Sequence, residues 1–307
     1  DAGFPADKIV FAGVGKADWE INLGLDNDIF CFNVESAVEL EIINELAAAK
    51  NKVASIALRI NPEVDAHTHA KITTGMKENK FGINLSQLGG VLDKLKEMKH
   101  VKLIGIHSHI GSQITDMSSF RNLVIRFNEI QEELEAHGVT VENLNFGGGL
   151  GIDYYHPNHL SIPAFDNYFA AIHKLLQVRP GQQVHFEPGR SIVAQCGTLI
   201  SKVLYVKEGE TKKFAILDAG FTELIRPAMY DAYHRIENIS SDEAVETYDV
   251  VGPICESSDV FGKDVELNKA HRGDLIALRS AGAYGEVMAS QYNCRHLPKA
   301  YYSDTIK

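Results

Sequence analysis

The feature that most constrains the fold is an alternation of short apolar runs with longer helical segments, from residue 8 to about residue 190. In the longer segments apolar residues recur every three or four positions, as on the buried face of an amphipathic helix. Strands that alternate with such helices predict βα units and a parallel sheet. The runs that we assign to strands are Lys8–Gly13, Ile29–Val34, Ala54–Ile60, Leu103–Ile110, Asn143–Gly147 and Gln183–Glu187.

Nearly all of these runs end in polar or glycine-rich residues. Chemistry at the C-terminal ends of successive parallel strands is typical of a (β/α)8 barrel of the TIM type. Six strands do not close such a barrel, and the first residues, Asp1 to Pro5, read like the end of a helix that runs into a loop. We therefore expect an α/β fold with an incomplete TIM-type barrel of about six βα units, from which two strands are missing.

After about residue 194 the helical periodicity disappears, and β-branched and apolar runs stand between glycines and charged residues. This pattern is typical of antiparallel β structure. We expect a partial barrel domain over residues 1–193 and a mostly antiparallel β-barrel domain over residues 194–307, itself incomplete. Examples of these β runs are Thr198–Val206, Lys213–Leu217, Glu246–Val251 and Asp274–Leu278.

Charge and cysteine usage exclude several classes of protein. The net charge is −11, with 30 basic and 41 acidic residues, so nucleic acid and anionic membranes are unfavourable partners. No apolar stretch approaches the ~18 residues that a membrane span needs, and no signal-peptide pattern is present. The four cysteines, Cys31, Cys196, Cys255 and Cys294, lie far apart. That spacing favours free thiols in a reducing cytoplasm over disulfides or a zinc site.

A glycine cluster, Gly147-Gly148-Gly149-Leu150-Gly151, follows one predicted strand. Without side chains at these positions, backbone N–H groups can approach an anion closely, so a phosphate-binding loop is the functional interpretation. A tight turn is the alternative. A dinucleotide-binding fold is disfavoured, because its strand–loop–helix fingerprint with a distal acid is not evident.

Two histidines, His107 and His109, share one face of a predicted strand because they are two positions apart. Such a pair could bind zinc, but few other ligands stand near the strand ends, and we expect no metal. Stacking on a flat cofactor needs only one ring. Glu187 to Arg190 end the next strand, and beside a phosphate loop we interpret them as part of the same site rather than as a capping ion pair. His67 and His69 lie in a polar stretch and are expected to be solvated.

Cys255 is flanked by acidic residues in the segment Cys255 to Asp259. A buried structural cysteine is the default for any single cysteine. A polar turn departs from that default and predicts an exposed thiol that is available for proton transfer.

Taken in order, these segments resemble the alanine-racemase-like barrel family of pyridoxal-phosphate enzymes (fold type III), and within it the decarboxylases. The resemblance spans nearly the whole chain, and further segments are similar to the branch that acts on diaminopimelate. The family segments are His109–Gln113, Gly147–Gly149, Glu187–Arg190, Cys255–Ser257 and Gly282–Gly285, and those of the branch are Gly13–Lys16, Lys77–Gly82, Asp218–Gly220 and Arg226–Tyr230.

The resemblance implies pyridoxal 5'-phosphate as the cofactor. His109 would stack on its pyridine ring, Glu187 would face the ring nitrogen, and Ser112 with the glycines would hold the phosphate. Tyr284 would close the cofactor site. The implied cofactor-binding residues are His109, Ser112, Gly147, Gly148, Gly149, Glu187, Gly189, Arg190 and Tyr284.

The resemblance also implies a homodimer with shared active sites, in which Cys255 and Glu256 reach in from the partner subunit. Cys255 would return a proton to the substrate after carbon dioxide leaves, so His109, Glu187 and Cys255 form the implied catalytic set. The implied substrate-binding residues are Arg190, Arg226, Tyr230, Glu256 and Tyr284.

The chemistry of the residues agrees with these roles. Decarboxylation leaves a carbanion whose electrons the cofactor ring absorbs best when its nitrogen is protonated, and a carboxylate such as Glu187 favours that proton. Family racemases usually place an arginine there, so Glu187 favours decarboxylation. Arg190 and Arg226 suit a second carboxylate on the substrate, which diaminopimelate has and ornithine or lysine lacks. The expected reaction converts meso-2,6-diaminopimelate to L-lysine and carbon dioxide, the last step of bacterial lysine biosynthesis.

One family feature is absent from the sequence. The family anchors its cofactor as a Schiff base on a lysine of the first barrel strand, in a Tyr-Ala-x-Lys-Ala-like segment that this chain lacks. Lys16 ends what we interpret as the third barrel strand and is a poor substitute, so the chain alone is expected to be inactive. Two alternatives stay open: a decarboxylase of another basic amino acid or polyamine precursor, and a non-catalytic binding homologue.

Overall fold

The computed structural model describes residues 2–64, 80–159 and 163–305. His67, His69 and residues 77–79 of the branch segment Lys77–Gly82 lie outside them. The chain divides into two compact units, one of Asp1–Leu150 with Phe165–Pro188 and one of Gly151–Ala164 with Gly189–Lys307. The division at residues 193 and 194 stays a prediction.

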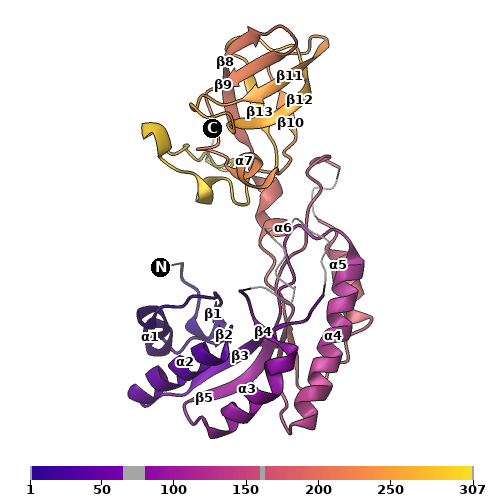
Figure 1. Cartoon of the computed structure of the whole chain (residues 1–307). Coiled ribbons are helices and arrows are strands. Elements are labelled where there is room, and N and C mark those ends of the chain that lie inside the picture. Colours follow the sequence, from indigo (N-terminus) through magenta and orange to yellow (C-terminus); the bar gives the residue numbers. More distant parts are fainter. Residues whose placement is uncertain (1, 65–79, 160–162, 306–307) are drawn as a thin grey trace. The chain divides into compact units, whose positions relative to one another are not determined.

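The first unit is built on a seven-stranded parallel sheet in the order β1-β2-β3-β5-β6-β7, with β4 paired to β3 (Figure 1). All six predicted strands are present, which confirms the partial α/β barrel. Most of them are shorter than the predicted runs, because the polar and glycine-rich tips leave the sheet. The strands are β1 Val10–Phe11, β2 Cys31–Val34, β3 Ala54–Asn61, β4 Ile83–Asn84, β5 Val101–His107, β6 Asn143–Asn145 and β7 Gln183–His185.

Helices follow the strands and cover the sheet. α2 contacts β2, β3 and β5, and α3 contacts β3 and β4 (Figure 1). Ser36 caps α2, since its side chain accepts a hydrogen bond from the Glu39 N–H at 3.1 Å. The helices of this unit are η1 Ala6–Lys8, α1 Asp18–Asp26, α2 Ala37–Ala49, α3 Leu85–Glu97, α4 Met117–Ala136 and α5 Phe165–His173.

The two faces of the parallel sheet differ in polarity. Leu58, Ile106 and Leu144 are fully or almost fully buried in the apolar core that the sheet forms with its helices. Successive side chains of a strand point to opposite faces, so the next residues, Arg59, His107 and Asn145, point away from that core. Register pairs Arg59 with His107 and His107 with Asn145, so the polar side chains form a row on the other face.

The second unit contains a six-stranded sheet in the order β10-β13-β8-β9-β11-β12. Its pairs are antiparallel except for β9 with β11, and the outermost strands β10 and β12 also contact each other, so the sheet is mixed and nearly closed. This confirms the predicted β-barrel architecture. The strands are β8 Leu199–Glu208, β9 Lys213–Leu217, β10 Ile236–Asn238, β11 Val245–Val251, β12 Val260–Asn268 and β13 Leu275–Leu278.

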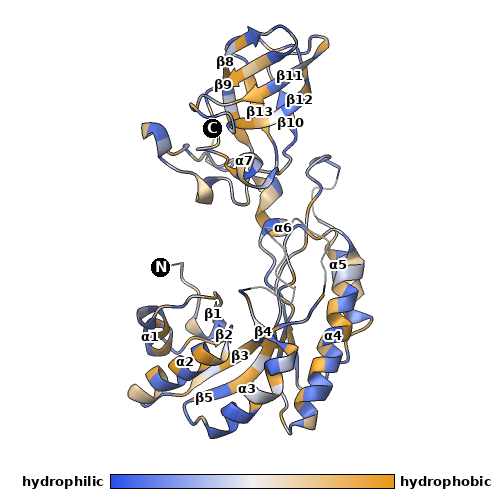
Figure 2. Ribbon diagram, viewed as in Figure 1, coloured by the Kyte–Doolittle hydropathy of each residue, from blue (hydrophilic) through white to orange (hydrophobic). Residues whose placement is uncertain are grey.

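Short helical turns connect the strands of the second unit, and they are α6 Arg190–Val193, η2 Ala194–Cys196, α7 Arg226–Tyr230, η3 Glu286–Met288 and η4 Tyr292–Cys294. Strands of both units carry much of the hydrophobic colour in Figure 2, whereas α3 and α4 show both kinds of residue. None of the helices in the described residues is long and apolar enough to cross a membrane.

The packing between sheet and helices predicts a large loss of stability for Phe146→Ala. Phe146 is fully buried and stacks on Phe127 with ring centroids 4.1 Å apart. Emptying this position should lower the free energy of unfolding by about 3–5 kcal/mol, measured by urea unfolding. The matched control Phe4→Ala, at a side chain that is 75% exposed, should cost less than about 0.5 kcal/mol. Equal losses in the two variants would contradict this account of the core.

Candidate active site

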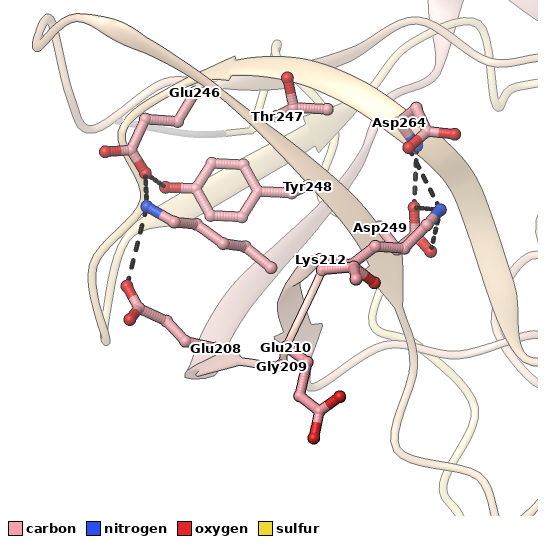
Figure 3. Close-up of a pocket in the computed structure, with 11 residues that line it drawn as sticks. Glu208, Gly209, Glu210, Lys212, Glu246, Thr247, Tyr248, Asp249 and Asp264 are labelled. Carbon is pink, nitrogen blue, oxygen red and sulfur yellow. Dashed lines mark hydrogen bonds and ion pairs between the residues drawn. The ribbon is translucent and has the colours of Figure 1, made fainter.

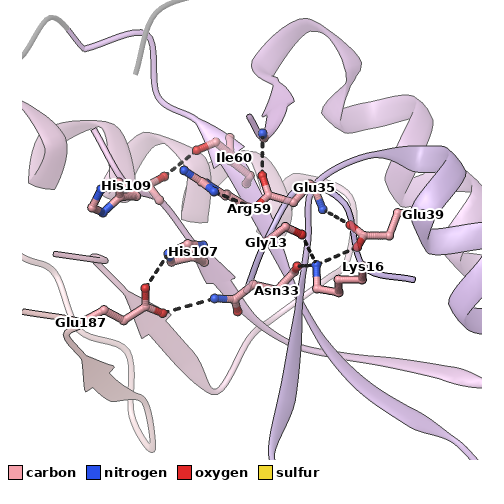
Figure 4. A network of polar contacts seen from close by, with 12 residues as sticks. Gly13, Lys16, Asn33, Glu35, Glu39, Arg59, Ile60, His107, His109 and Glu187 are labelled. Carbon is pink, nitrogen blue, oxygen red and sulfur yellow. Dashed lines mark hydrogen bonds and ion pairs between the residues drawn. The ribbon is translucent and has the colours of Figure 1, made fainter. Parts of the chain in front are cut away.

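The first unit gathers polar side chains where its parallel strands end (Figure 4). Glu187, two residues beyond β7, accepts hydrogen bonds at Oε1 from Asn145 Nδ2 at 2.8 Å and from Asn33 Nδ2 at 3.3 Å. His107 Nε2 lies 3.4 Å from its other oxygen, Oε2. Asn33 belongs to β2, which is not a neighbour of β7 in the sheet. The contact therefore shows that the sheet curls, as it would in a barrel.

These contacts control the charge of Glu187. Desolvation raises the pKa of its carboxyl, but the contact with His107 and the hydrogen bond from Asn145 outweigh that effect, and the pKa falls to about 2. The side chain nevertheless keeps 35% of its surface exposed. Glu187 is thus an ionised carboxylate with room for one more donor.

His109 presents an oriented, uncharged ring close by. Its Nδ1 accepts a hydrogen bond from the Gly148 N–H at 3.1 Å. Burial, together with the nearby charge of Arg59, lowers the pKa of His109 to about 4, so the ring is neutral near neutral pH. A neutral imidazole with one nitrogen engaged suits stacking on a flat ring.

The glycine cluster brings three strand ends closer together than side chains would allow. A Cβ on Gly147 would overlap the Ser108 carbonyl oxygen, and one on Gly148 would overlap that of Glu187. A Cβ on Gly149 would lie 2.6 Å from the Gly111 carbonyl oxygen, and Gly149 also has a φ of +107°. The N–H of Gly147 donates to Asn145 Oδ1 and that of Gly148 to His109, so both groups also fix the site itself.

The donor set therefore fits pyridoxal phosphate. An ionised carboxylate that can accept from a protonated ring nitrogen, a neutral ring for stacking and a loop of three glycines occur together in one unit. Ser112 is half-buried in the loop after β5, and Gly189, just before α6, belongs to the second unit.

Lys16 is a structural cation. Its Nζ donates to the carbonyl oxygens of Gly13 at 2.7 Å and Asn33 at 2.6 Å and to Glu39 Oε1 at 2.6 Å, and its side chain is fully buried. An ammonium with three acceptors is poorly suited to form a covalent bond to a carbonyl carbon, in line with the expectation from the sequence.

Sequence reasoning missed a second buried pair. Arg59 Nη1 lies 2.6 Å from Glu35 Oε1, and Glu35 Oε2 accepts from the Gly82 N–H at 3.0 Å. The available signal in the sequence was an acid directly after one predicted strand and a base inside the apolar run of the next strand.

In the second unit, two predicted substrate-binding arginines gather around one tyrosine. Arg190 Nη1 donates to the Tyr154 hydroxyl at 2.7 Å, and the Arg226 guanidinium lies 5.0 Å from the Tyr154 ring centroid. Arg190 also lies over Tyr284 at 4.9 Å. Both arginines are buried, so their charges are concentrated in a small region. Tyr154 had no predicted role.

His234 completes this cluster and was also missed. Its Nε2 accepts from Arg226 Nη1 at 2.7 Å, so the ring proton is on Nδ1, which donates to the Arg279 carbonyl oxygen at 2.8 Å. Burial lowers the pKa of His234, the hydrogen bond to the Arg279 carbonyl opposes this effect, the charge of Arg226 adds to it, and the pKa is about 4 as a result.

The remaining predicted residues lie on other segments of the second unit. Cys255 and Glu256 are exposed in the turn between β11 and β12, as expected for an available thiol. Glu256 Oε1 accepts from the Tyr292 hydroxyl at 2.7 Å. The buried carboxylate of Asp259 holds this turn by accepting from the N–H groups of Ile254 and Phe221 at 2.7 and 2.6 Å.

Tyr230 ends α7 and is partly exposed. The functional roles of these residues stay predictions.

A pocket of the second unit at the β8–β9 turn contains no predicted site residue (Figure 3). Its Lys212 lies 3.1 Å from both Asp249 and Asp264. The neighbouring Lys213 is shared in the same way by Glu208 and Glu246. Since each lysine is already shared by two carboxylates, we assign these pairs a structural role.

The glycine loop predicts opposite effects for two glycine-to-alanine changes in the first unit. Gly148→Ala places a Cβ against the backbone of Glu187 and should cost about 1–3 kcal/mol of unfolding free energy. Gly90→Ala, in the exposed part of α3 with no atom near the new Cβ, should gain about 0.5–1 kcal/mol from helix propensity. Urea unfolding measures both, and a neutral Gly148→Ala would contradict the close packing.

The environment of His234 predicts that stability falls with acidity. The unfolded chain takes up a proton on this histidine at about pH 6.5, whereas the folded chain resists until about pH 4. The contribution of His234 to the free energy of unfolding is therefore fully present above about pH 6.5. It falls by about 3 kcal/mol as the pH is lowered to about 4. His234→Gln should flatten this decline in urea unfolding at several pH values. His296→Gln, at an exposed position, should leave it unchanged, and equal slopes in all three proteins would refute the assignment.

Comparison with known proteins identifies the family. A sequence model of the pyridoxal-binding domain of pyridoxal-dependent decarboxylases matches residues 1–194. Diaminopimelate decarboxylase of Bacteroides thetaiotaomicron is 68% identical over 305 residues, which cover 99% of this chain and 79% of that protein. Diaminopimelate decarboxylase of Haemophilus influenzae is 45% identical over 300 residues, with 96% and 70% covered.

Solved structures give the same result. The crystal structure of Helicobacter pylori diaminopimelate decarboxylase in complex with L-lysine has a TM-score of 0.88 and 41% identity, covering 95% of this chain and 72% of that chain. The Paramecium bursaria Chlorella virus arginine decarboxylase, at 21% identity and a TM-score of 0.82 over 95% of this chain and 76% of its own, shares the fold. The resemblance found in the sequence is confirmed, and the chain belongs to the diaminopimelate decarboxylase family of carboxy-lyases.

Proposed function

We propose that this protein decarboxylates meso-2,6-diaminopimelate to L-lysine and carbon dioxide with pyridoxal 5'-phosphate as its cofactor. The observation that carries the proposal is the carboxylate of Glu187, which stays ionised where Asn145 and Asn33 donate to it and His107 lies 3.4 Å away. When bound, pyridoxal phosphate supplies a ring that takes up the electron pair left at the α-carbon as carbon dioxide departs.

The first unit would hold the cofactor. Glu187 would keep a proton on the ring nitrogen, since an ionised carboxylate within hydrogen-bond distance favours the protonated form. His109 would lie against one face of the ring and fix its plane. The loop Gly147–Gly149 would leave room for the phosphate, and Ser112 would supply it with a hydroxyl group. A phosphate contact of Gly189 stays a prediction from the sequence.

The second unit would recognise the end of the substrate that does not react. Arg190 and Arg226 suit a carboxylate, because guanidinium groups bind it through paired hydrogen bonds. Their position around Tyr154 supports this role, since two buried cations favour a bound anion. Tyr230 and Tyr284 would border the same substrate.

Cys255 would donate the proton that replaces the lost carboxylate, and Glu256 would bind the distal ammonium. The exposure of both residues supports the further proposal of a homodimer in which they serve the partner subunit. The cytoplasm stays the proposed compartment, on the ground of the sequence.

The charge of Arg226 tests the choice of substrate. Arg226→Ala should lower kcat/KM for meso-diaminopimelate by about a hundredfold, because it removes charge-assisted hydrogen bonds worth about 3 kcal/mol. Carbon dioxide release by the natural gene product is the measurement. Arg235→Ala, at a half-exposed arginine that pairs with Glu237 at 3.7 Å, is the matched control and should change little.

Two outcomes would refute the proposed reaction. Release of carbon dioxide from ornithine or arginine but not from diaminopimelate would indicate the decarboxylase of another basic amino acid. No release from any of these amino acids, with pyridoxal phosphate present, would indicate a non-catalytic homologue.

A further inference from the structure

His107 is buried at the centre of the polar row of the first unit without an assigned role. Its side chain is 1% exposed, and neither ring nitrogen has a hydrogen-bond partner of good geometry within the described parts of the chain. Its nearest charged neighbour is Glu187, whose Oε2 lies 3.4 Å from Nε2 (Figure 4). A buried polar ring without partners is costly, so this contact calls for a functional explanation.

The two oxygens of Glu187 have different surroundings. Asn145 and Asn33 both donate to Oε1. Within the described residues His107 is the polar side chain next to Oε2. A carboxylate that is held at one oxygen can still turn about its terminal bond, which is torsionally soft. Contacts at both oxygens fix the plane of the carboxylate, and with it the direction of its remaining lone pairs.

We propose that His107 is a positioning residue that holds Oε2 of Glu187 and, with Asn145 and Asn33, aims the carboxylate at the cofactor's ring nitrogen. The proposal rests on the proposed function, because it needs a ring nitrogen for Glu187 to face. Asn145 and Asn33 present amide N–H groups to the carboxylate, and His107 adds an N–H when its proton is on Nε2. The contacts with His107 and Asn145 lower the pKa of the Glu187 carboxyl and so favour its ionised form.

The geometry of the sheet makes this arrangement possible. His107 ends β5 and Asn145 ends β6, and the two are register partners whose side chains share a face. Asn33 reaches the same carboxylate from β2. Three strand ends thus converge on one side chain that follows β7.

A packing role for His107 is the competing explanation, and two substitutions separate them. His107→Leu fills a similar volume without a donor. His107→Gln keeps an N–H at about the distance of Nε2 from the backbone. If His107 only fills space, the two variants should behave alike, whereas a positioning role requires that glutamine restores what leucine removes.

The experiment compares two ligands in each variant. Apoprotein is titrated by fluorescence with pyridoxal phosphate and with its 1-deaza analogue, in which a C–H group replaces the ring nitrogen. The ratio of the two Kd values reports the Glu187–nitrogen interaction alone, because a general loosening of the fold weakens both ligands alike. Glu187→Ala, which has no group to contact the ring nitrogen, gives the preference expected without this interaction. Ser119→Ala, at a buried hydroxyl of α4, is the control for substitution in the core.

The native protein should prefer pyridoxal phosphate by about tenfold or more, as a charge-assisted hydrogen bond implies. His107→Leu should remove most of that preference, His107→Gln should keep it within about twofold, and Ser119→Ala should not change it. Unchanged preference in His107→Leu would overturn the positioning role while leaving the cofactor assignment intact. No preference in the native protein, or no effect of Glu187→Ala, would overturn the placement of the cofactor and the positioning role together.

Discussion

A carboxylate that lies among packed strands must be surrounded by donors, and much of the first unit is arranged to meet this requirement for Glu187. Removing a charge from water is costly unless hydrogen bonds replace the water. Asn33, His107 and Asn145 supply these contacts from three strands, and the sheet must curl for Asn33 on β2 to reach a residue beyond β7. Because alternate side chains of a strand point to opposite faces, the apolar ones face the helices and the polar ones face the carboxylate.

The sequence was sufficient to predict the architecture because parallel strands that are buried on both faces read as short apolar runs. It could not reveal β4, whose two residues are a strand only because they pair with the end of β3. Strand β12 was not predicted from the sequence for a different reason. Gly262 and Asp264 interrupt its alternation at a register shift against β11, and Asp264 has a φ of +52°, so no period of two is visible there.

The site was predictable where motifs are contiguous and not where partners are distant. His109, Glu187 and the glycine loop were found because each stands in a short segment at a strand end. Asn33 and Asn145 look like ordinary polar residues, and only the folded sheet shows that Asn33 meets a carboxylate 154 positions later in the chain. Tyr154 and His234 were missed in the same way, because their importance comes from two arginines on other segments.

The second unit contains two charged clusters whose cations have different partners. Around Lys212 and Lys213 every cation is shared by carboxylates, and such pairs hold strands together at the surface. Arg226 instead contacts a tyrosine face and a neutral histidine, and within the described residues it has no acidic partner. A buried cation with such neighbours destabilises the fold until an anion arrives. The positive charge of Arg226 can therefore attract an anionic ligand. For this reason we propose a carboxylate ligand for this cluster and none for the lysine pairs.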